Sequence, residues 1–149
     1  MKAKAKPDYT FDEYLERFLA FLSQRKLRNT HERNMILHSV YDSETHFTVD
    51  SLKENLHQKK YFVAKTTLYS TLNLLIEADL IIKHYFSSQT LPQYEKLLAN
   101  GTHNHIYMED TQQVIDFSDP RIDEIIKDIE RIHNVSSMRH SFVVYCEKG

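Results

Sequence analysis

The segment from residue 66 to residue 95 constrains the fold most strongly, because a helical pattern runs directly into a hairpin pattern. From Thr66 to about Glu77, leucine and isoleucine recur at helical spacing on one side, while the opposite side carries small hydroxyl and amide groups. Such an outward face suits insertion into a groove. Residues 80–95 then predict a strand, a polar turn and a second strand.

Three further helices are predicted before this segment, starting near Thr10, near Thr30 and after Thr48 as an N-cap. Thr10 opens a capping box with Glu13, and apolar residues follow it at helical spacing. Thr30 and Thr48 precede the next two apolar patterns. Three helices after Thr30 followed by a hairpin is the order of a winged helix-turn-helix, in which the last helix enters the major groove and the wing touches the DNA backbone.

The remainder of the chain predicts a separate small α/β unit. A composition change near residues 98–101 marks the boundary, so we expect domains at 1–96 and 97–149. Strands are predicted near 104–108 and 113–117, a helix after Asp119 and Pro120, and a last strand from His140 to Tyr145. We expect isoleucine packing from the helix to hold this unit together. About 50 residues without a disulfide make a small core, so pairing with a second copy is the natural remedy. The expected fold class is α+β: an N-terminal winged helix-turn-helix DNA-binding domain plus a small C-terminal α/β dimerisation domain.

Composition excludes several classes of protein. The 149 residues include one cysteine, Cys146, which rules out an internal disulfide and fits a reducing, cytoplasmic location. No apolar run is long enough to cross a membrane. Residues 1–96 hold 14 Lys and Arg against 12 Asp and Glu, and residues 97–149 hold 5 against 9. The front half is therefore mildly basic and the back half acidic, which is only weak support for DNA binding.

Four stretches together resemble the ferric uptake regulator family, from about Leu27 to Tyr145. They are LRNTHERNMIL, THFTVDSL, TTLYSTLNLLIEADLI and the run from THNHIYM through VIDFSD to RID. The family's recognition-helix signature is present as Thr67-Leu68-Tyr69 followed by Leu72-Asn73. The resemblance implies a homodimeric, metal-sensing transcription factor with its regulatory metal at the hinge between the two domains.

Residue by residue, the resemblance implies a hinge site of imidazoles and carboxylates. Its ligands would be His46, Glu95, His103, His105 and Asp116. His103 and His105 alternate, so on a strand both imidazoles point to the same face. Glu95 stands one residue further from this pair than in the family pattern, and Asp116 replaces the usual glutamate. The other histidines at positions 31, 38, 57, 84 and 133 are expected to have surface roles.

Two further metal sites of the family are incomplete in this chain. A second site would draw on Asp123 and His140, but Thr102 and Asn104 replace two of its ligands. The family's C-x-x-C aligns with a methionine and a threonine, so no Cys-ligated structural zinc is expected. A nitrogen and oxygen ligand set suits a divalent transition metal such as Fe2+, Zn2+ or Mn2+.

For DNA, the resemblance points to recognition-helix residues and nearby cations. The candidates are Arg28, Arg33, Lys65, Thr67, Tyr69, Ser70 and Asn73. Ser70 stands where the family often has an arginine. An arginine can bind guanine through two hydrogen bonds, which favours guanine over other bases by roughly 1–3 kcal/mol. Serine cannot form this pair, so we expect an operator that differs from the one the family commonly recognises.

The sequence therefore predicts a metal-responsive DNA-binding repressor of metal homeostasis or oxidative stress genes. We expect the partners to be a double-stranded DNA operator and a second copy of the chain, with no membrane. One alternative is a winged-helix regulator that senses no metal. The other is a metal-dependent hydrolase, which is disfavoured because the chain has no H-E-x-x-H helix and no evident general base. We expect no enzymatic activity.

Overall fold

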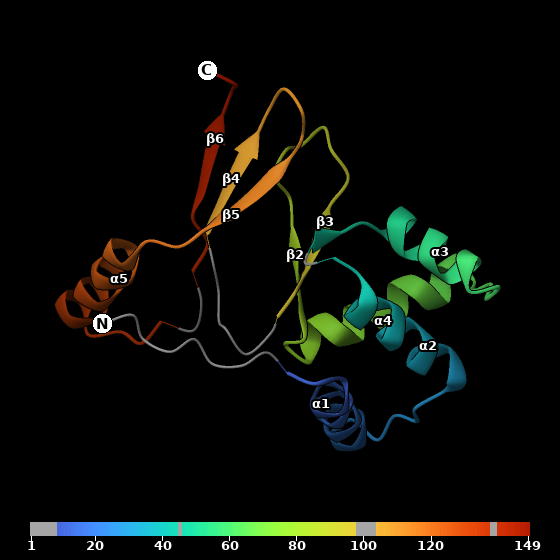
Figure 1. Ribbon diagram of the computed structural model, residues 1–149. Coiled ribbons are helices and arrows are strands. Elements are labelled where there is room, and N and C mark those ends of the chain that lie inside the picture. Colours follow the sequence, from blue (N-terminus) through green and yellow to red (C-terminus); the bar gives the residue numbers. More distant parts are fainter. Residues whose placement is uncertain (1–8, 45, 98–103, 138–139) are drawn as a thin grey trace. The chain divides into compact units, whose positions relative to one another are not determined.

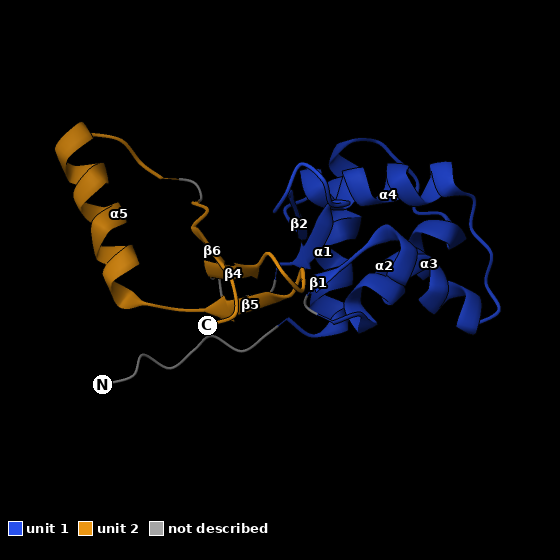
Figure 2. Cartoon of the chain, turned by 90° about the horizontal axis from the view of Figure 1, so that it is seen from above, with its two compact units in different colours: residues 1–100 blue, residues 101–149 orange. Residues whose placement is uncertain are grey.

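The structure is a computed structural model that describes residues 9–44, 46–97, 104–137 and 140–149. Its elements run in the order of Figure 1: α1 (Phe11–Gln24), α2 (His31–Asp42), β1 (His46–Phe47), α3 (Val49–Gln58), α4 (Lys65–Glu77), β2 (Ile81–His84), β3 (Gln93–Lys96), β4 (Asn104–Met108), β5 (Val114–Phe117), α5 (Pro120–His133) and β6 (Val143–Cys146). The chain divides into two compact units, Met1–Asn100 and Gly101–Gly149 (Figure 2). In the described part of the chain, no helix combines the length and the apolar character that crossing a bilayer requires.

The predicted caps at Thr10 and Thr48 are confirmed, and the second helix begins after Thr30, which is its N-cap. The Thr10 hydroxyl accepts from the Glu13 amide while the Glu13 carboxylate accepts from the Thr10 amide, which completes the capping box. Thr30 and Thr48 accept from backbone amides in the first turns of α2 and α3 in the same manner. Satisfying these otherwise unbonded amides fixes where each helix begins.

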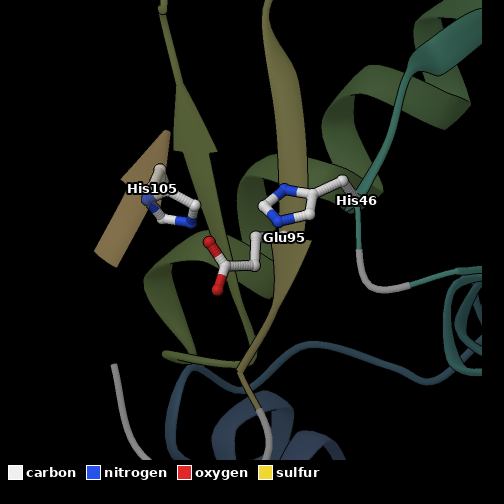
Figure 3. Close-up of side chains that lie close together, drawn as sticks. All are labelled: His46, Glu95 and His105. Atoms are coloured by element: carbon white, nitrogen blue, oxygen red, sulfur yellow. The ribbon is translucent and has the colours of Figure 1, made fainter. Parts of the chain in front are cut away.

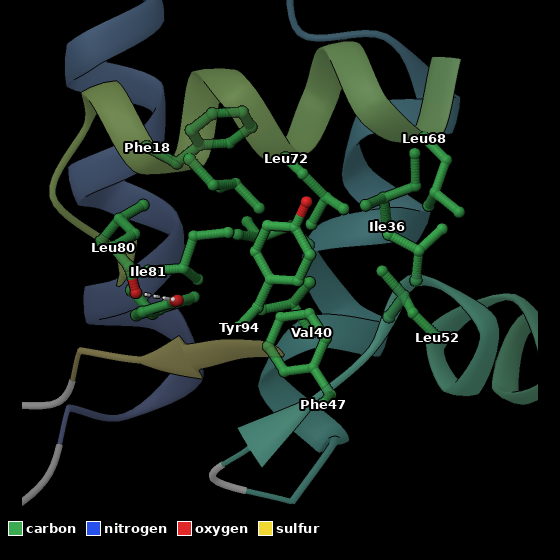
Figure 4. Close-up of a cluster of buried hydrophobic side chains, with 14 of the residues drawn as sticks. Phe18, Ile36, Val40, Phe47, Leu52, Leu68, Leu72, Leu80, Ile81 and Tyr94 are labelled. Atoms are coloured by element: carbon green, nitrogen blue, oxygen red, sulfur yellow. Dashed lines mark hydrogen bonds between the residues drawn. The ribbon is translucent and has the colours of Figure 1, made fainter. Parts of the chain in front are cut away.

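One apolar core joins the four helices of the first unit to its sheet. The apolar stripe of α4 supplies Leu68, Leu72 and Leu75, all almost completely buried. Figure 4 shows these helices packed around Phe47 and Tyr94, whose rings stack with their centroids 5.6 Å apart. The buried Tyr14 hydroxyl donates to the Leu80 carbonyl oxygen at 2.7 Å and so ties α1 to the residue that precedes β2.

The wing is a three-stranded antiparallel sheet in the order β1-β3-β2. The hairpin of β2 and β3 is the predicted one, but β1, which has only two residues, was not predicted. Its partner is β3, where His46 lies opposite Glu95 and Phe47 opposite Tyr94. Lys96 donates from its ammonium group to the carbonyl oxygens of Tyr41 and Ser43, which fixes the chain between α2 and β1.

The second unit is a three-stranded sheet in the order β5-β4-β6 with the helix α5. β4 pairs with β5 in antiparallel and with β6 in parallel orientation. Asp119 caps α5 and Pro120 is its first residue, as predicted. The last strand starts at Val143, three residues later than expected, because parallel pairing with β4 begins where Val143 lies opposite His105.

The expectation that isoleucines of α5 hold the second unit together is wrong for the single chain. No residue of α5 is buried, and the helix exposes Ile125, Ile129 and Ile132 by 58%, 48% and 64%. The apolar stripe exists as predicted, but no described part of its own unit buries it.

Candidate functional site

One face of the wing sheet gathers His46 and Glu95. Paired residues of neighbouring strands project to the same side, so the register of β1 and β3 sets these two side chains next to each other. The Glu95 side chain is only 2% exposed. A buried carboxylate is costly without a partner, so its surroundings must compensate its charge. Figure 3 draws His46 on β1 and Glu95 on β3, together with His105 of the second unit.

His84 is one such compensating group, and the sequence did not identify it. Its Nε2 lies 2.7 Å from Oε2 of Glu95, and its side chain is 12% exposed. The expected surface role of His84 is therefore wrong. The register explains the contact, because Ile82 lies opposite Glu95 and His84 is two residues further along the same strand, on the same face. His38 is half-buried, and its ring stacks on Phe11 with the centroids 3.8 Å apart.

The second unit holds its own imidazole and carboxylate pair. His105 on β4 lies opposite Asp116 on β5, and 3.5 Å separate Nε2 of His105 from Oδ1 of Asp116. The His105 side chain is 3% exposed and that of Asp116 is 35% exposed. His103, the other half of the predicted H-x-H pair, lies outside the described residues.

The two residues predicted for a second metal site are Asp123 on α5 and His140 in the segment before β6. Asp123 is exposed on α5. His140 contacts Asn104 instead, with 3.3 Å between its Nε2 and the amide oxygen of Asn104. Asn104 is one of the two replacements in this site, so the described contact of His140 is with an amide rather than with a carboxylate.

The exposed side of α4 has the polar character that the sequence predicts. Thr66, Tyr69, Ser70 and Asn73 are exposed, while Leu68, Thr71 and Leu72 are buried. The Ser70 hydroxyl donates to the carbonyl oxygen of Thr67 at 3.0 Å, and the Thr71 hydroxyl donates to the same oxygen at 2.8 Å. The donor of Ser70 is thus used within its own helix.

The start of α4 and the loop before α2 carry the predicted cations. Lys65 is the first residue of α4, and the N-cap residue Ala64 has only a methyl group, so this helix start lacks a side-chain cap. Arg28 is exposed before α2. The Arg33 guanidinium donates to the carbonyl oxygen of Arg28 and so holds the loop that presents Arg28.

Lys83 on β2 is a cation of the wing that the sequence did not single out. Its ammonium nitrogen lies 5.1 Å from the ring centroid of Tyr85 and 6.0 Å from that of Tyr94. A hydrogen bond with Tyr85 raises the pKa of Lys83 above its ordinary value. Lys83 is therefore firmly charged at neutral pH. Its neighbour His84 points to the other face of the sheet, because successive strand residues alternate.

Comparison with known proteins decides the family. The sequence model of the ferric uptake regulator family matches residues 24–145. The chain belongs to this family. A ferric uptake regulation protein of Campylobacter jejuni is 33% identical over 138 residues, which cover 91% of this chain and 86% of that protein.

Solved structures of ferric uptake regulators share the architecture. The Pseudomonas aeruginosa regulator, solved with manganese, has a TM-score of 0.76 at 26% identity and covers 87% of this chain and 96% of its own. The Helicobacter pylori regulator, described as having three functional metal-binding sites, has a TM-score of 0.77 at 24% identity over 95% of this chain and 94% of its own, which supports the fold alone.

Membership of the ferric uptake regulator family confirms the predicted fold class, a winged-helix DNA-binding domain with a C-terminal dimerisation domain. It also confirms the predicted class of function. Ferric uptake regulators are metal-responsive transcription regulators and not enzymes, so the hydrolase alternative is excluded.

Proposed function

We propose that this ferric uptake regulator is a homodimeric repressor whose regulatory metal joins the wing sheet to the second unit. The wing would contribute His46 and Glu95. The second unit would contribute His103, His105 and Asp116. The observation that carries the proposal is the register pair of His46 and the buried Glu95, since a buried carboxylate beside an imidazole is a ready half of a cation site.

The donor set fits a divalent transition metal. Imidazole nitrogens and carboxylate oxygens form a ligand shell of borderline hardness that suits Fe2+, Mn2+ or Zn2+ better than a soft ion. Affinity for such a shell rises along the Irving–Williams order, so zinc will bind in a test tube whichever metal acts in the cell. When bound, the metal supplies positive charge that compensates Glu95 and Asp116.

Regulation would follow from linkage between metal binding and DNA binding. Ligands from both units can bind one ion together only at a restricted angle between the units, so the metal selects that arrangement. In a dimer, that angle determines whether two α4 helices match two successive half-sites. A metal that prefers this state about 100-fold shifts the equilibrium by about 2.7 kcal/mol, enough to switch an operator.

Side chains of α4 would contact the bases of the operator, and nearby cations would contact its phosphates. Thr67, Tyr69 and Asn73 would meet base edges and sugar. Lys65, Arg28 and the wing residue Lys83 are cations suited to phosphate. Arg33 supports this interface by holding the loop of Arg28 rather than by standing free itself.

Ser70 separates this protein from regulators with an arginine at that position. Its hydroxyl donates within α4, so it offers no bidentate contact to guanine. The operator selected by this protein is therefore expected to differ at the base pair that an arginine there would read.

The deciding experiment combines metal analysis with operator binding. Protein purified without chelator or affinity tag is analysed for bound metals, and its DNA binding is measured with and without the metal found. The double variant His103→Ala with His105→Ala should lose metal-stimulated DNA binding and keep its helical circular dichroism. The matched control changes two exposed histidines, His57→Ala with His133→Ala, and should respond to metal as the wild type does.

Two results would contradict the proposal. An undiminished metal response in the double variant would remove the ligand assignment. DNA binding by the wild type that ignores every divalent metal would support a winged-helix regulator that senses no metal.

A further inference from the structure

His84 has a place in the wing sheet that its role as a surface histidine does not explain. It and Glu95 share the sheet face on which His46 lies, and the carboxylate and the imidazole are 2.7 Å apart. Because so short a contact requires a hydrogen between the two heavy atoms and the carboxylate is the natural acceptor, Nε2 of His84 is the donor.

The ring of His84 is held from a second side. It stacks on Phe86 with the centroids 5.2 Å apart and the planes 21° apart. Phe86 is buried, at 4% exposure, so this surface under the imidazole is fixed. The ring is therefore oriented by packing and aimed at one oxygen of Glu95.

The neighbouring imidazole of His46 is differently placed. The ring centroids of His46 and His84 are 6.4 Å apart, and Glu95 lies directly opposite His46 in the register. The two imidazoles and the carboxylate therefore lie on one sheet face. In the proposed centre, Glu95 would bind the cation together with His46 while Oε2 accepts from His84.

We infer that His84 is a positioning residue of the metal centre, which orients the Glu95 carboxylate by donating to Oε2. The inference rests on the proposed function, because it takes Glu95 and His46 as ligands. Hydrogen bonds that orient a ligating group typically contribute 10–100-fold to metal affinity. His84 would act through Glu95 and not by binding the metal itself.

The test uses two substitutions of His84 in the full-length protein. His84→Gln keeps an N–H donor that reaches the Nε2 position but removes the imidazole that transition metals prefer. His84→Leu removes the donor and keeps an apolar side chain against Phe86. The matched control is His57→Leu, since His57 is exposed on α3, outside the wing sheet.

Cobalt(II) is the probe, because its visible absorption reports both affinity and the ligand field. His84→Leu should weaken cobalt binding by about 10–100-fold and alter the spectrum. His84→Gln should bind cobalt within about threefold of the wild type and reproduce its spectrum, as expected if the hydrogen bond is what matters. Thermal melting of the metal-free variants measures their stability separately. If His84→Leu weakened cobalt binding only by destabilising the wing, glutamine at this position would not be expected to restore the wild-type affinity.

The outcomes separate a failure of the proposed metal centre from a failure of the role assigned to His84. If the wild type binds no cobalt, or if Glu95→Ala binds it as tightly as the wild type, the proposed metal centre fails. If Glu95→Ala weakens binding but His84→Leu does not, only the role of His84 is refuted. Equal losses in His84→Gln and His84→Leu would also refute positioning, because they would make His84 a ligand.

Discussion

The exposed isoleucines of α5 give the sharpest prediction about assembly. Ile125, Ile129 and Ile132 lie on one side of the helix, and each keeps about half or more of its side chain in water in the single chain. An amphipathic helix without a cover calls for a partner surface. A second copy of the chain is the occupant we propose, and Ile129→Asp is the change that tests it.

The expected loss of dimer stability can be worked out from the exposed fraction of the Ile129 side chain. Complete burial of an isoleucine is worth about 1.5–3 kcal/mol, so covering the 48% of Ile129 that is exposed would contribute roughly 0.7–1.5 kcal/mol in each copy. A twofold interface contains the residue twice, which doubles the loss. Desolvating an unpaired carboxylate at each position adds to this. A total of about 3 kcal/mol or more corresponds to a dimer dissociation constant raised at least about 100-fold.

Sedimentation equilibrium over a range of protein concentrations measures this constant directly. The control is Lys127→Asp, which changes more charge on an exposed residue of the same helix and should leave the dimer intact. Ile129→Asp should keep the helical circular dichroism of the monomer, because the side chain is already half-exposed there. An unchanged dissociation constant, or an equal loss in the control, would refute the assignment of this helix face to the dimer.

Three other predictions concern single groups. Lys83→Ala should weaken operator binding and reduce its salt dependence by about one unit of slope, with little change in sequence preference, as gel shifts at several salt concentrations would show. Tyr14→Phe should cost about 1 kcal/mol of unfolding free energy in urea titrations, since the Leu80 carbonyl keeps another donor and only one hydrogen bond is lost. The hydrogen bond from Arg121 lowers the pKa of Asp119 to about 2 from its ordinary 3.8, so the stability that this charged N-cap gives α5 is fully present above about pH 3.8 and is lost as the pH falls through about 2. Arg121→Ala should move the carboxyl titration, followed by NMR, back towards 3.8.

Local chemistry made the helices predictable. Each threonine cap satisfies amides within three residues, and each apolar stripe needs only helical spacing to be recognised. The hairpin of β2 and β3 and the cap of α5 by Asp119 are local in the same sense, so their positions agree with the structure within a few residues.

Contacts that depend on register were not predictable from the sequence. β1 has two residues, too few for any period, and it exists because β3 offers it an edge. The role of His84 depends on which residue lies opposite Glu95, and a shift by one residue would turn the imidazole to the other face. The exposure of the α5 isoleucines depends on tertiary packing, which helical spacing alone does not specify.

The wing sheet carries residues proposed for metal binding on one face and a residue proposed for DNA binding on the other. On one face, Glu95 lies with His46 and His84; on the other, Tyr94 and Phe47 enter the core and Lys83 contacts Tyr85. Lys83 and His84 are consecutive, so a metal bound by Glu95, which His84 contacts, would restrain the backbone that carries the Lys83 cation. Metal binding would therefore act on the wing directly, in addition to any change of angle between the units. If the Lys83→Ala variant binds metal normally but its DNA binding is stimulated less by metal, this local route operates. If the ratio of DNA affinities with and without metal is unchanged, the angle between the units accounts for the whole effect.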